Sequence, residues 1–247
     1  MGYEPYSWLS EHYDRLMGHV QYAQWAQSIQ KILKRHKIAP HMLLELGAGT
    51  CRLAPWLSIP SLQQRVHTDL SLDMLRQAEA DFPYSRVTCN ATTLPFSQKF
   101  DWVLMCYDAA NYLSEQALQT MFAEIYRVLL PGGIFLFDVT TEENSLQWFE
   151  DYVDAFETSG GLLLRRSSYD AEHHEQHNFF DLFTPASAGL YERKQEHHIQ
   201  YIYPILTLCS WLNECDFVVV DLLDAQNLRP AREKSERVQI LATRKRT

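Results

Sequence analysis

The segment LLELGAGTCRL, residues 43–53, decides the fold. Together with Met42 it starts as a short apolar run, which predicts a buried strand over residues 42–46. Gly47-Ala48-Gly49 then predicts a turn at which backbone can approach a ligand closely. A helix is expected over residues 52–58. A strand, a glycine turn and a helix in this order indicate the first unit of an α/β fold.

The same alternation continues along the chain. Further strands are expected at 65–70, 85–91, 100–108 and 134–140, one or two helices within 6–36, and helices at 71–82 and 113–130. Ser71 and Ser114 are expected as N-caps, and Pro131-Gly132-Gly133 as a stop. A helix at 205–217 and a hairpin of two strands, 217–225 and 236–245, would complete the sheet. The sequence therefore predicts an α/β, Rossmann-like, seven-stranded and mostly parallel sheet with helices on both faces.

Period-two strand patterns with turn signals follow residue 160 and predict an antiparallel β insertion. The expected division is N-terminal helices at 1–40, a core at 41–158 and 205–247, and the insertion at 159–204. Because the insertion follows the fifth strand, it is expected to cover the ligand end of the sheet as a lid.

Acidic side chains at the ends of the first two strands restrict the ligand. The dinucleotide pattern GxGxxG would need glycine at position 52, where Arg52 stands. The carboxylate of Glu45 would repel a pyrophosphate at the turn and attract an ammonium group. Asp69, at the end of the next strand, is suited to ribose hydroxyls. A ligand with a ribose, a positive charge and no phosphate at the turn is expected, and S-adenosylmethionine has that combination.

With these features the chain resembles class I S-adenosylmethionine-dependent methyltransferases. The motifs that carry the resemblance are LLELGAGTCRL, HTDLSLDMLRQA, CNATTLPF with FDWVLMCYDAANYL, and LLPGGIFLFDV. More loosely, HYDRLM and QYAQW near the front, and YERKQEHHIQYIY and SERVQILATRK near the back, are similar to the small-molecule branch with a lid after the fifth strand. The resemblance implies methyl transfer to a small acceptor by in-line displacement.

The resemblance also implies roles for individual positions. The cofactor-binding residues it implies are Glu45, Gly47 and Gly49 at the methionine moiety, Asp69 at the ribose, Leu70 and Met74 near the adenine, Asn90 and Ala91 at the adenine edge, Tyr107 at the methyl-transfer side, and Tyr13 and Tyr22 closing from the front helices. Asp108 and His198 are candidates to take a proton from the acceptor, and Asn111 and Tyr112 are candidates to contact it. Core packing is the alternative for Met74, and a helix-entry turn for Asn111 and Tyr112.

Two positions depart from the family pattern. Cys51 stands where glycine is usual, and if that position needed a positive φ its side chain would cost about 1 kcal/mol. Asn90 stands where aspartate is usual, and its carbonyl oxygen can still accept a hydrogen bond from the adenine amino group. Weaker affinity or selectivity is expected at these positions, with binding retained.

Composition excludes several classes of protein. The net charge of −9 and the lack of a basic cluster beyond Arg244-Lys245-Arg246 argue against a nucleic-acid partner and mildly favour a neutral or cationic acceptor. The odd number of cysteines without a CxxC pair argues against a disulfide framework and favours the cytoplasm. No apolar stretch is long enough to span a membrane.

Histidines concentrate in the insertion, at positions 173, 174, 177, 197 and 198. Their spacing does not match a helical zinc motif, so no metal site is expected and exposed strand histidines are the preferred interpretation. Glu196 and His198 would nevertheless share one face of a strand. The exposed aromatic residues expected at Phe179 and Phe180 could pair two chains as a homodimer.

Two other functions stay open. A nicotinamide-dependent oxidoreductase would use the same kind of sheet, although Arg52 and Glu45 argue against it. A non-catalytic protein that binds S-adenosylmethionine or a partner protein would be compatible with the departures at Cys51 and Asn90.

Overall fold

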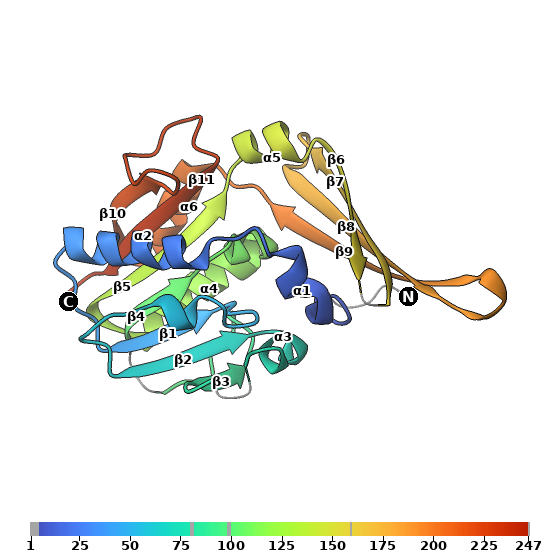
Figure 1. Cartoon of the computed structure of the whole chain (residues 1–247). Coiled ribbons are helices and arrows are strands. Elements are labelled where there is room, and N and C mark those ends of the chain that lie inside the picture. The colour runs from blue at the N-terminus through green and yellow to red at the C-terminus, as the bar shows by residue number, and fades with distance from the viewer. Residues whose placement is uncertain (1–4, 80–81, 98–99, 159, 247) are drawn as a thin grey trace.

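A computed structural model describes residues 5–79, 82–97, 100–158 and 160–246. Its main sheet has seven strands in the order β10-β11-β5-β4-β1-β2-β3 (Figure 1). The strands are β1 Met42–Leu46, β2 Gln64–Asp69, β3 Ser85–Thr88, β4 Phe100–Met105, β5 Leu129–Thr140, β10 Phe217–Asp224 and β11 Arg237–Arg244. Strands β1 to β5 pair in parallel, whereas β11 runs antiparallel to both β5 and β10. The predicted seven-stranded, mostly parallel sheet is confirmed.

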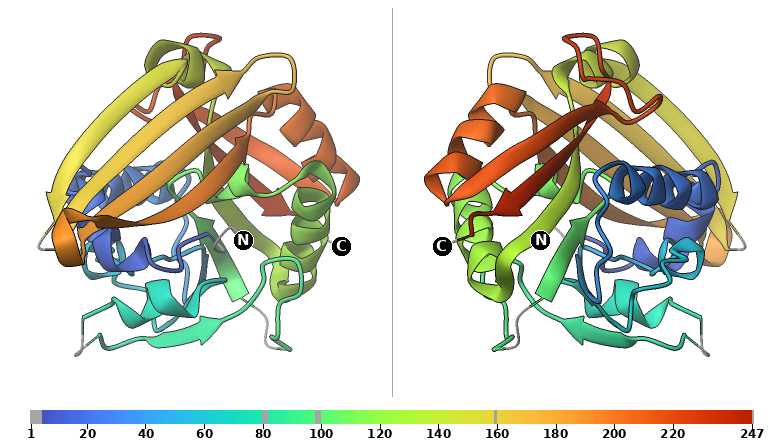
Figure 2. Two further views of the ribbon diagram at one scale, coloured as in Figure 1. Left: turned by 90° about the vertical axis from the view of Figure 1, so that its right-hand side faces the viewer. Right: turned by 90° about the vertical axis from the view of Figure 1, so that its left-hand side faces the viewer.

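Helices cover both faces of this sheet (Figure 2). The helices are α1 Ser10–Leu16, α2 Tyr22–Arg35, α3 Leu72–Arg76, α4 Glu115–Val128, α5 Glu142–Trp148 and α6 Ile205–Glu214. Successive strand residues point to opposite faces, so Leu44 and Val103 pack with α4 and α6, whereas Leu43 and Trp102 pack with α2. The sheet therefore lies between two apolar layers, and its strand ends are left for polar groups.

A second, antiparallel sheet has the order β6-β7-β8-β9. Its strands are β6 Asp151–Thr158, β7 Gly161–Asp170, β8 Glu175–Pro185 and β9 Tyr191–Tyr201. It lies over the end of the main sheet at which α1 is found, and the β8–β9 hairpin extends away from the body (Figure 1). This second sheet is the predicted insertion, but it begins at Asp151, inside the range expected for the core.

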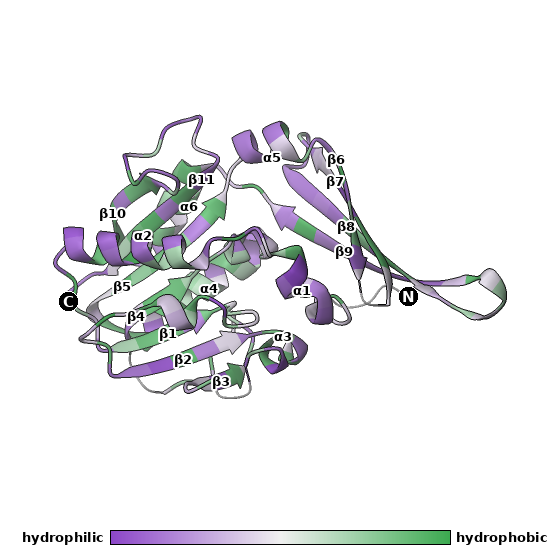
Figure 3. Cartoon of the chain, in the orientation of Figure 1, coloured by the Kyte–Doolittle hydropathy of each residue, from purple (hydrophilic) through white to green (hydrophobic). Residues whose placement is uncertain are grey.

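The two sheets differ in hydropathy. Apolar residues follow one another along the central strands of the main sheet, whereas hydrophilic and hydrophobic residues are mixed along the second sheet (Figure 3). The inner face of the second sheet carries a buried seam of amide and hydroxyl groups. The Ser145 hydroxyl donates to Gln176, and the side-chain amides of Gln176 and Asn178 donate to Gln200. Gln200 in turn donates to Asp108 of the main sheet.

Three local expectations are corrected. The helix expected over residues 52–58 is a short 3-10 turn, Ala54–Trp56, because Pro55 lies inside the expected helix and has no N–H to donate to the preceding turn. The helix expected over 71–82 ends at Arg76, and residues 80 and 81 lie outside the described residues. Strand β5 begins at Leu129 and passes through Gly132, whose φ is +77°, so the expected stop is an irregular part of the strand.

The two predicted N-caps are found at their positions. The Ser71 hydroxyl accepts a hydrogen bond from the Met74 N–H at 3.2 Å. Ser114 occupies the N-cap position of α4 without a side-chain hydrogen bond to that helix.

Candidate cofactor and acceptor site

The glycine turn follows β1 with left-handed backbone at alternate positions. Gly47, Gly49 and Cys51 have φ values of 63°, 56° and 60°. A Cβ at Gly47 would lie 2.9 Å from Ala109 Cβ, so a larger residue there would force the backbone to shift. Cys51 has a positive φ, which is the case in which its side chain was expected to cost about 1 kcal/mol relative to glycine.

Asp69 holds this turn from the end of β2. Its carboxylate accepts hydrogen bonds from the N–H groups of Gly49 and Ser71, both at 2.8 Å. Burial raises the pKa of Asp69, and these backbone donors oppose that rise. Met74 is buried and lies beside Gly49, whereas the next residue after Asp69, Leu70, is 70% exposed. The carboxylate of Asp69 is therefore held in one orientation, and the adjacent apolar side chain of Leu70 is exposed.

Glu45 is paired with a residue that the sequence analysis did not identify. It lies opposite His67 in the register of β1 and β2, and its Oε2 is 2.5 Å from His67 Nδ1. Both side chains are buried. Glu45 thus lies near the end of β1 as predicted, but its carboxylate is paired with the His67 imidazole and is not a lone charge.

Asn90 and Ala91 follow β3. The Oδ1 atom of Asn90 accepts hydrogen bonds from the N–H of Thr92 at 2.9 Å and from its hydroxyl at 2.8 Å. The carbonyl oxygen expected to face adenine is thus turned toward Thr92, while the Asn90 side chain stays exposed and Ala91 is half-buried.

Tyr107 and Asp108 follow β4 with consecutive positive φ values of 61° and 51°. Asp138 of β5 holds this bend, because its carboxylate accepts the N–H groups of Tyr107 at 2.7 Å and Asp108 at 3.0 Å. Arg237 of β11 donates to the carboxylates of both Asp108 and Asp138. Arg237 lies in the segment SERVQILATRK, but nothing in the sequence indicated that it pairs with Asp108 and Asp138.

The arrangement corrects the prediction that Asp108 takes a proton from the acceptor. One of its oxygens accepts a hydrogen bond from Arg237 and the other from Gln200. Both oxygens of Asp108 thus already have donors, so Asp108 acts as an anchor between the bend and the second sheet.

Asn111 is a structural residue rather than an open contact for the acceptor. It is fully buried, and its amide nitrogen donates to the carbonyl oxygens of Tyr201 at 2.8 Å and Thr140 at 3.3 Å. Its Oδ1 accepts the N–H of Thr140 at 3.0 Å. Asn111 thus joins the turn after β4 to both sheets.

Aromatic residues from the front of the chain meet these strand ends. Tyr22 lies edge-on to Tyr107 with ring centroids 5.2 Å apart, and Tyr6 lies edge-on to Tyr13 at 5.5 Å. The Tyr6 and Tyr112 hydroxyls are 2.7 Å apart. Burial raises the pKa of Tyr22 to about 12, so it is a neutral phenol near pH 7.

His198 lies on the inner face of the second sheet, and it is 1% exposed. This contradicts the interpretation that all the insertion histidines are exposed, although His173, His174 and His197 are. His198 Nε2 lies 2.9 Å from Glu196 Oε2, and the ring of Tyr6 is 4.6 Å away. Its buried Nδ1 has no hydrogen-bond partner among the described residues.

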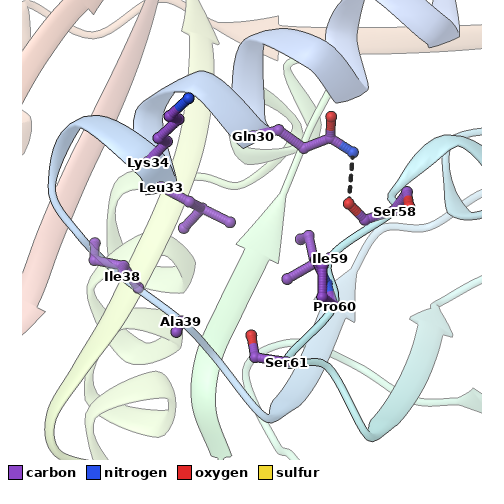
Figure 4. A pocket seen from close by; sticks show the side chains of 9 residues that line it. All are labelled: Gln30, Leu33, Lys34, Ile38, Ala39, Ser58, Ile59, Pro60 and Ser61. Carbon is purple, nitrogen blue, oxygen red and sulfur yellow. Dashed lines mark hydrogen bonds between the residues drawn. The ribbon is translucent and has the colours of Figure 1, made fainter.

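A cavity of about 640 Å³ opens beside Tyr107, Asp108 and Arg237, with Trp25 and Gln24 of α2 on its other side. A second cavity of about 390 Å³ lies between the end of α2 and residues 58–61 (Figure 4). Its wall contains Leu33, Ile59 and Pro60 and has no acidic residue. Of the groups described above, the first cavity adjoins Tyr107, Asp108 and Arg237.

The structure also bears on the exclusions. Within the described ranges, no group of three or more His, Cys, Asp or Glu residues is placed to hold a metal ion. No helix in the described part of the chain is both long and apolar enough to cross a membrane.

Comparison with known proteins agrees with this arrangement. Residues 43–133 match a family model described as a methyltransferase domain. A Geobacillus sp. (strain WCH70) protein named as a methyltransferase is 30% identical over 250 residues, which cover 98% of this chain and 99% of that protein. A Bacillus subtilis (strain 168) protein with a methyltransferase name is 27% identical over 87% of this chain and 88% of its own length.

Solved structures share the fold. An S-adenosylmethionine-dependent methyltransferase from Clostridium acetobutylicum matches with a TM-score of 0.80 at 21% identity, over 98% of this chain and 100% of that chain. The sugar N-methyltransferase KedS8 from Streptoalloteichus sp. matches with a TM-score of 0.75 at 15% identity, over 94% of this chain and 91% of that chain. With a full-length relative at 30% identity and a glycine turn held by Asp69 at the end of β2, this chain belongs to the family of S-adenosylmethionine-dependent methyltransferases.

Proposed function

We propose that this protein transfers the methyl group of S-adenosylmethionine to a nitrogen or oxygen nucleophile of a small molecule by in-line displacement. The observation that carries the proposal is the Asp69 carboxylate, which Gly49 N–H and Ser71 N–H orient at the end of β2. The sugar N-methyltransferase KedS8 shares the fold and supports a small acceptor.

The residues present fit the cofactor. Gly47 and Gly49 leave space that a Cβ would fill, and Asp69 offers a carboxylate to ribose hydroxyls. In the proposal Glu45 lies at the methionine end, with its charge shared with His67. Asn90 and Ala91 meet the adenine edge, and exposed Leu70 packs on its ring.

When bound, S-adenosylmethionine supplies an electrophilic methyl group whose sulfur keeps the electrons of the broken bond. The protein positions the nucleophile on the axis of that bond, with Tyr107 and Tyr112 near the acceptor. For an amine or hydroxyl acceptor, His198 takes the released proton at Nδ1. Its Nε2–H is directed to Glu196, which leaves Nδ1 as the unprotonated nitrogen.

Calorimetry and a product assay test the proposal and its two alternatives. S-adenosylhomocysteine should bind, NAD should not, and S-adenosylhomocysteine should form from S-adenosylmethionine with some member of a panel of small amines and alcohols. Tight binding of NAD would instead favour the nicotinamide-dependent oxidoreductase. Binding of S-adenosylhomocysteine without turnover of any acceptor would favour the non-catalytic protein.

We also propose a cytoplasmic location and a homodimer through the insertion. Phe180 is buried on the inner face of the second sheet, and half-buried Phe179 stacks on His197 with ring centroids 4.2 Å apart. Neither aromatic residue is thus freely exposed for pairing. Cell fractionation and the native mass in solution test the location and the oligomeric state.

A further inference from the structure

The segment of residues 5–9, here called the N-terminal strap, is held by one carboxylate of the second sheet. Glu196 lies on β9 and is fully buried. Its oxygens accept hydrogen bonds from the N–H of Tyr6 at 2.7 Å, the hydroxyl of Ser7 at 2.9 Å, and the N–H groups of Trp8 at 2.9 Å and Leu9 at 3.1 Å. The strap therefore depends on Glu196 for contacts nearly 200 residues away along the chain.

Glu196 depends equally on the strap. Burial by itself would raise the pKa of Glu196, but the hydrogen bonds from His198, Leu9 and Ser7 outweigh burial and lower it. A buried carboxylate that lost these donors would be an unsatisfied charge, which is strongly unfavourable. The carboxylate and the strap are thus stable together, and neither is readily separated from the other.

The same carboxylate orients His198. Because Glu196 is ionised and acceptor-only, the proton on the facing nitrogen must belong to His198 Nε2. Nδ1 is consequently the free acceptor, and the Tyr6 ring of the strap covers His198 at 4.6 Å. With the strap in this position, Nδ1 is buried.

The strap also reaches the cofactor side of the site. The carbonyl oxygen of Tyr6 accepts a hydrogen bond from the Ser71 hydroxyl at 3.3 Å, and the Ser71 N–H donates to Asp69. Tyr6 has a φ of 61°, which is an unfavourable conformation for a tyrosine. The strap thus extends from Ser71, which is hydrogen-bonded to Asp69, to His198. Its contacts must maintain the unfavourable backbone conformation at Tyr6.

We propose that Glu196 is a positioning residue that couples closure of the N-terminal strap to the proton-accepting state of His198. The role of this coupling in catalysis rests on the proposed methyl transfer. The contacts of the strap and His198 with Glu196 are features of the structure itself. With the strap closed, its donors stabilise the Glu196 charge and make that carboxylate a weaker partner for a protonated His198. With the strap open, Glu196 loses those donors and holds the protonated imidazole more strongly.

The groups that face His198 come from several elements. Glu196 lies on its own strand, Tyr6 on the strap, Tyr112 after β4 and Phe180 on β8. The charge of Arg165 on β7 acts on Tyr112 and lowers its pKa, against the stronger effect of burial. Tyr6 and Tyr112 have pKa values raised by burial and stay neutral through the range in which a histidine titrates.

Two measurements on Glu196→Gln test the proposal. Hydrogen exchange of the Tyr6, Trp8 and Leu9 amides reports the strap, and NMR titration of His198, assigned with His198→Asn, reports the imidazole pKa. Both are made with S-adenosylhomocysteine bound. We expect exchange of these amides to rise at least tenfold and the pKa of His198 to fall, because the adjacent negative charge is removed. Glu192→Gln, an exposed carboxylate on the same strand, is the matched control and should change neither.

Ser7→Ala separates coupling from a general loss of structure. This variant removes one strap donor but keeps the Glu196 charge, so it should loosen the strap while it raises the pKa of His198. The two variants should therefore move the His198 pKa in opposite directions. The proposal would be overturned if both variants moved the His198 pKa in the same direction. It would also be overturned if hydrogen exchange of the strap amides were unchanged in Glu196→Gln.

Neither measurement needs turnover. Absence of methyl transfer in the parent protein would contradict the proposed function while the exchange and titration results still decide the coupling. If turnover is found, Glu196→Gln should shift the lower limb of the pH–rate profile in the same direction as the His198 pKa.

Discussion

Replacing Arg237 with methionine leaves two neighbouring carboxylates without the cation that lies between them. Arg237 donates to Asp108 and to Asp138, and Asp138 in turn holds the N–H groups of Tyr107 and Asp108 in their positive-φ bend. The perturbation therefore affects both the charge balance and the loop that borders the cavity of about 640 Å³. Methionine keeps most of the side-chain volume, so the loss of charge is the main change.

The expected loss of stability follows from burial. Removing one partner of a buried ion pair costs about 3–5 kcal/mol. The side chains of Asp108 and Arg237 are 21% and 24% exposed, which favours the lower end, about 3 kcal/mol. For a chain of this length each kcal/mol corresponds to about 2–4 °C, so the melting temperature should fall by roughly 6–12 °C.

The loss should also depend on pH. Burial raises the pKa of Asp138 and Arg237 opposes that rise, so removal of Arg237 raises the pKa further. The folded variant then takes up a proton at a higher pH than the unfolded chain does, which stabilises the folded state as the pH falls. The deficit relative to the parent should be smaller at pH 5 than at pH 8.

Calorimetric melts of the parent, Arg237→Met and the exposed control Arg232→Met measure these differences. A double variant that also carries Asp108→Asn should recover part of the lost melting temperature, because one uncompensated charge is removed while Asp138 still accepts both N–H groups of the bend. A melting temperature of Arg237→Met within about 2 °C of the parent would refute the reasoning, as would an equal deficit at both pH values.

Three further predictions concern the cofactor side. Asp69→Asn should weaken S-adenosylhomocysteine binding about 10- to 100-fold by calorimetry, because charge-assisted hydrogen bonds are worth about 1.5–3 kcal/mol; unchanged affinity would remove Asp69 from the site. Gly47→Ala should lower the melting temperature and the affinity together, since its Cβ would lie 2.9 Å from Ala109 Cβ at positive φ; wild-type behaviour would show that the turn can move. Cys106, whose thiol pKa burial raises, should resist iodoacetamide at pH 8 in the native state, and rapid modification detected by mass spectrometry would contradict its burial.

The sequence was informative where structure is set by neighbouring residues. The apolar run before Gly47 and the Ser71 cap are local patterns, and both were found where they were expected. The short turn at Ala54–Trp56 was missed because the helix expected over residues 52–58 took no account of Pro55 inside it.

The side chains that pair with Glu45 and Asp108 were not predicted, because they lie far from these residues along the chain. His67 meets Glu45 because of the register between β1 and β2. Arg237 reaches Asp108 because the last strand inserts beside β5, and no local pattern records that pairing. A resemblance to a family supplied the positions proposed to face the cofactor, but it did not show how each charged side chain is paired.

The seam of Gln176, Asn178 and Gln200 has a practical consequence for altering acceptor choice. Amides bond in fixed directions, so a one-residue slip of the second sheet would break the seam and reverse the faces of its strands. The strands of the second sheet can therefore pair in only one register. Variants designed to change the choice of acceptor should begin at aromatic positions such as Tyr112, which is proposed to contact the acceptor, and leave the three amides unchanged.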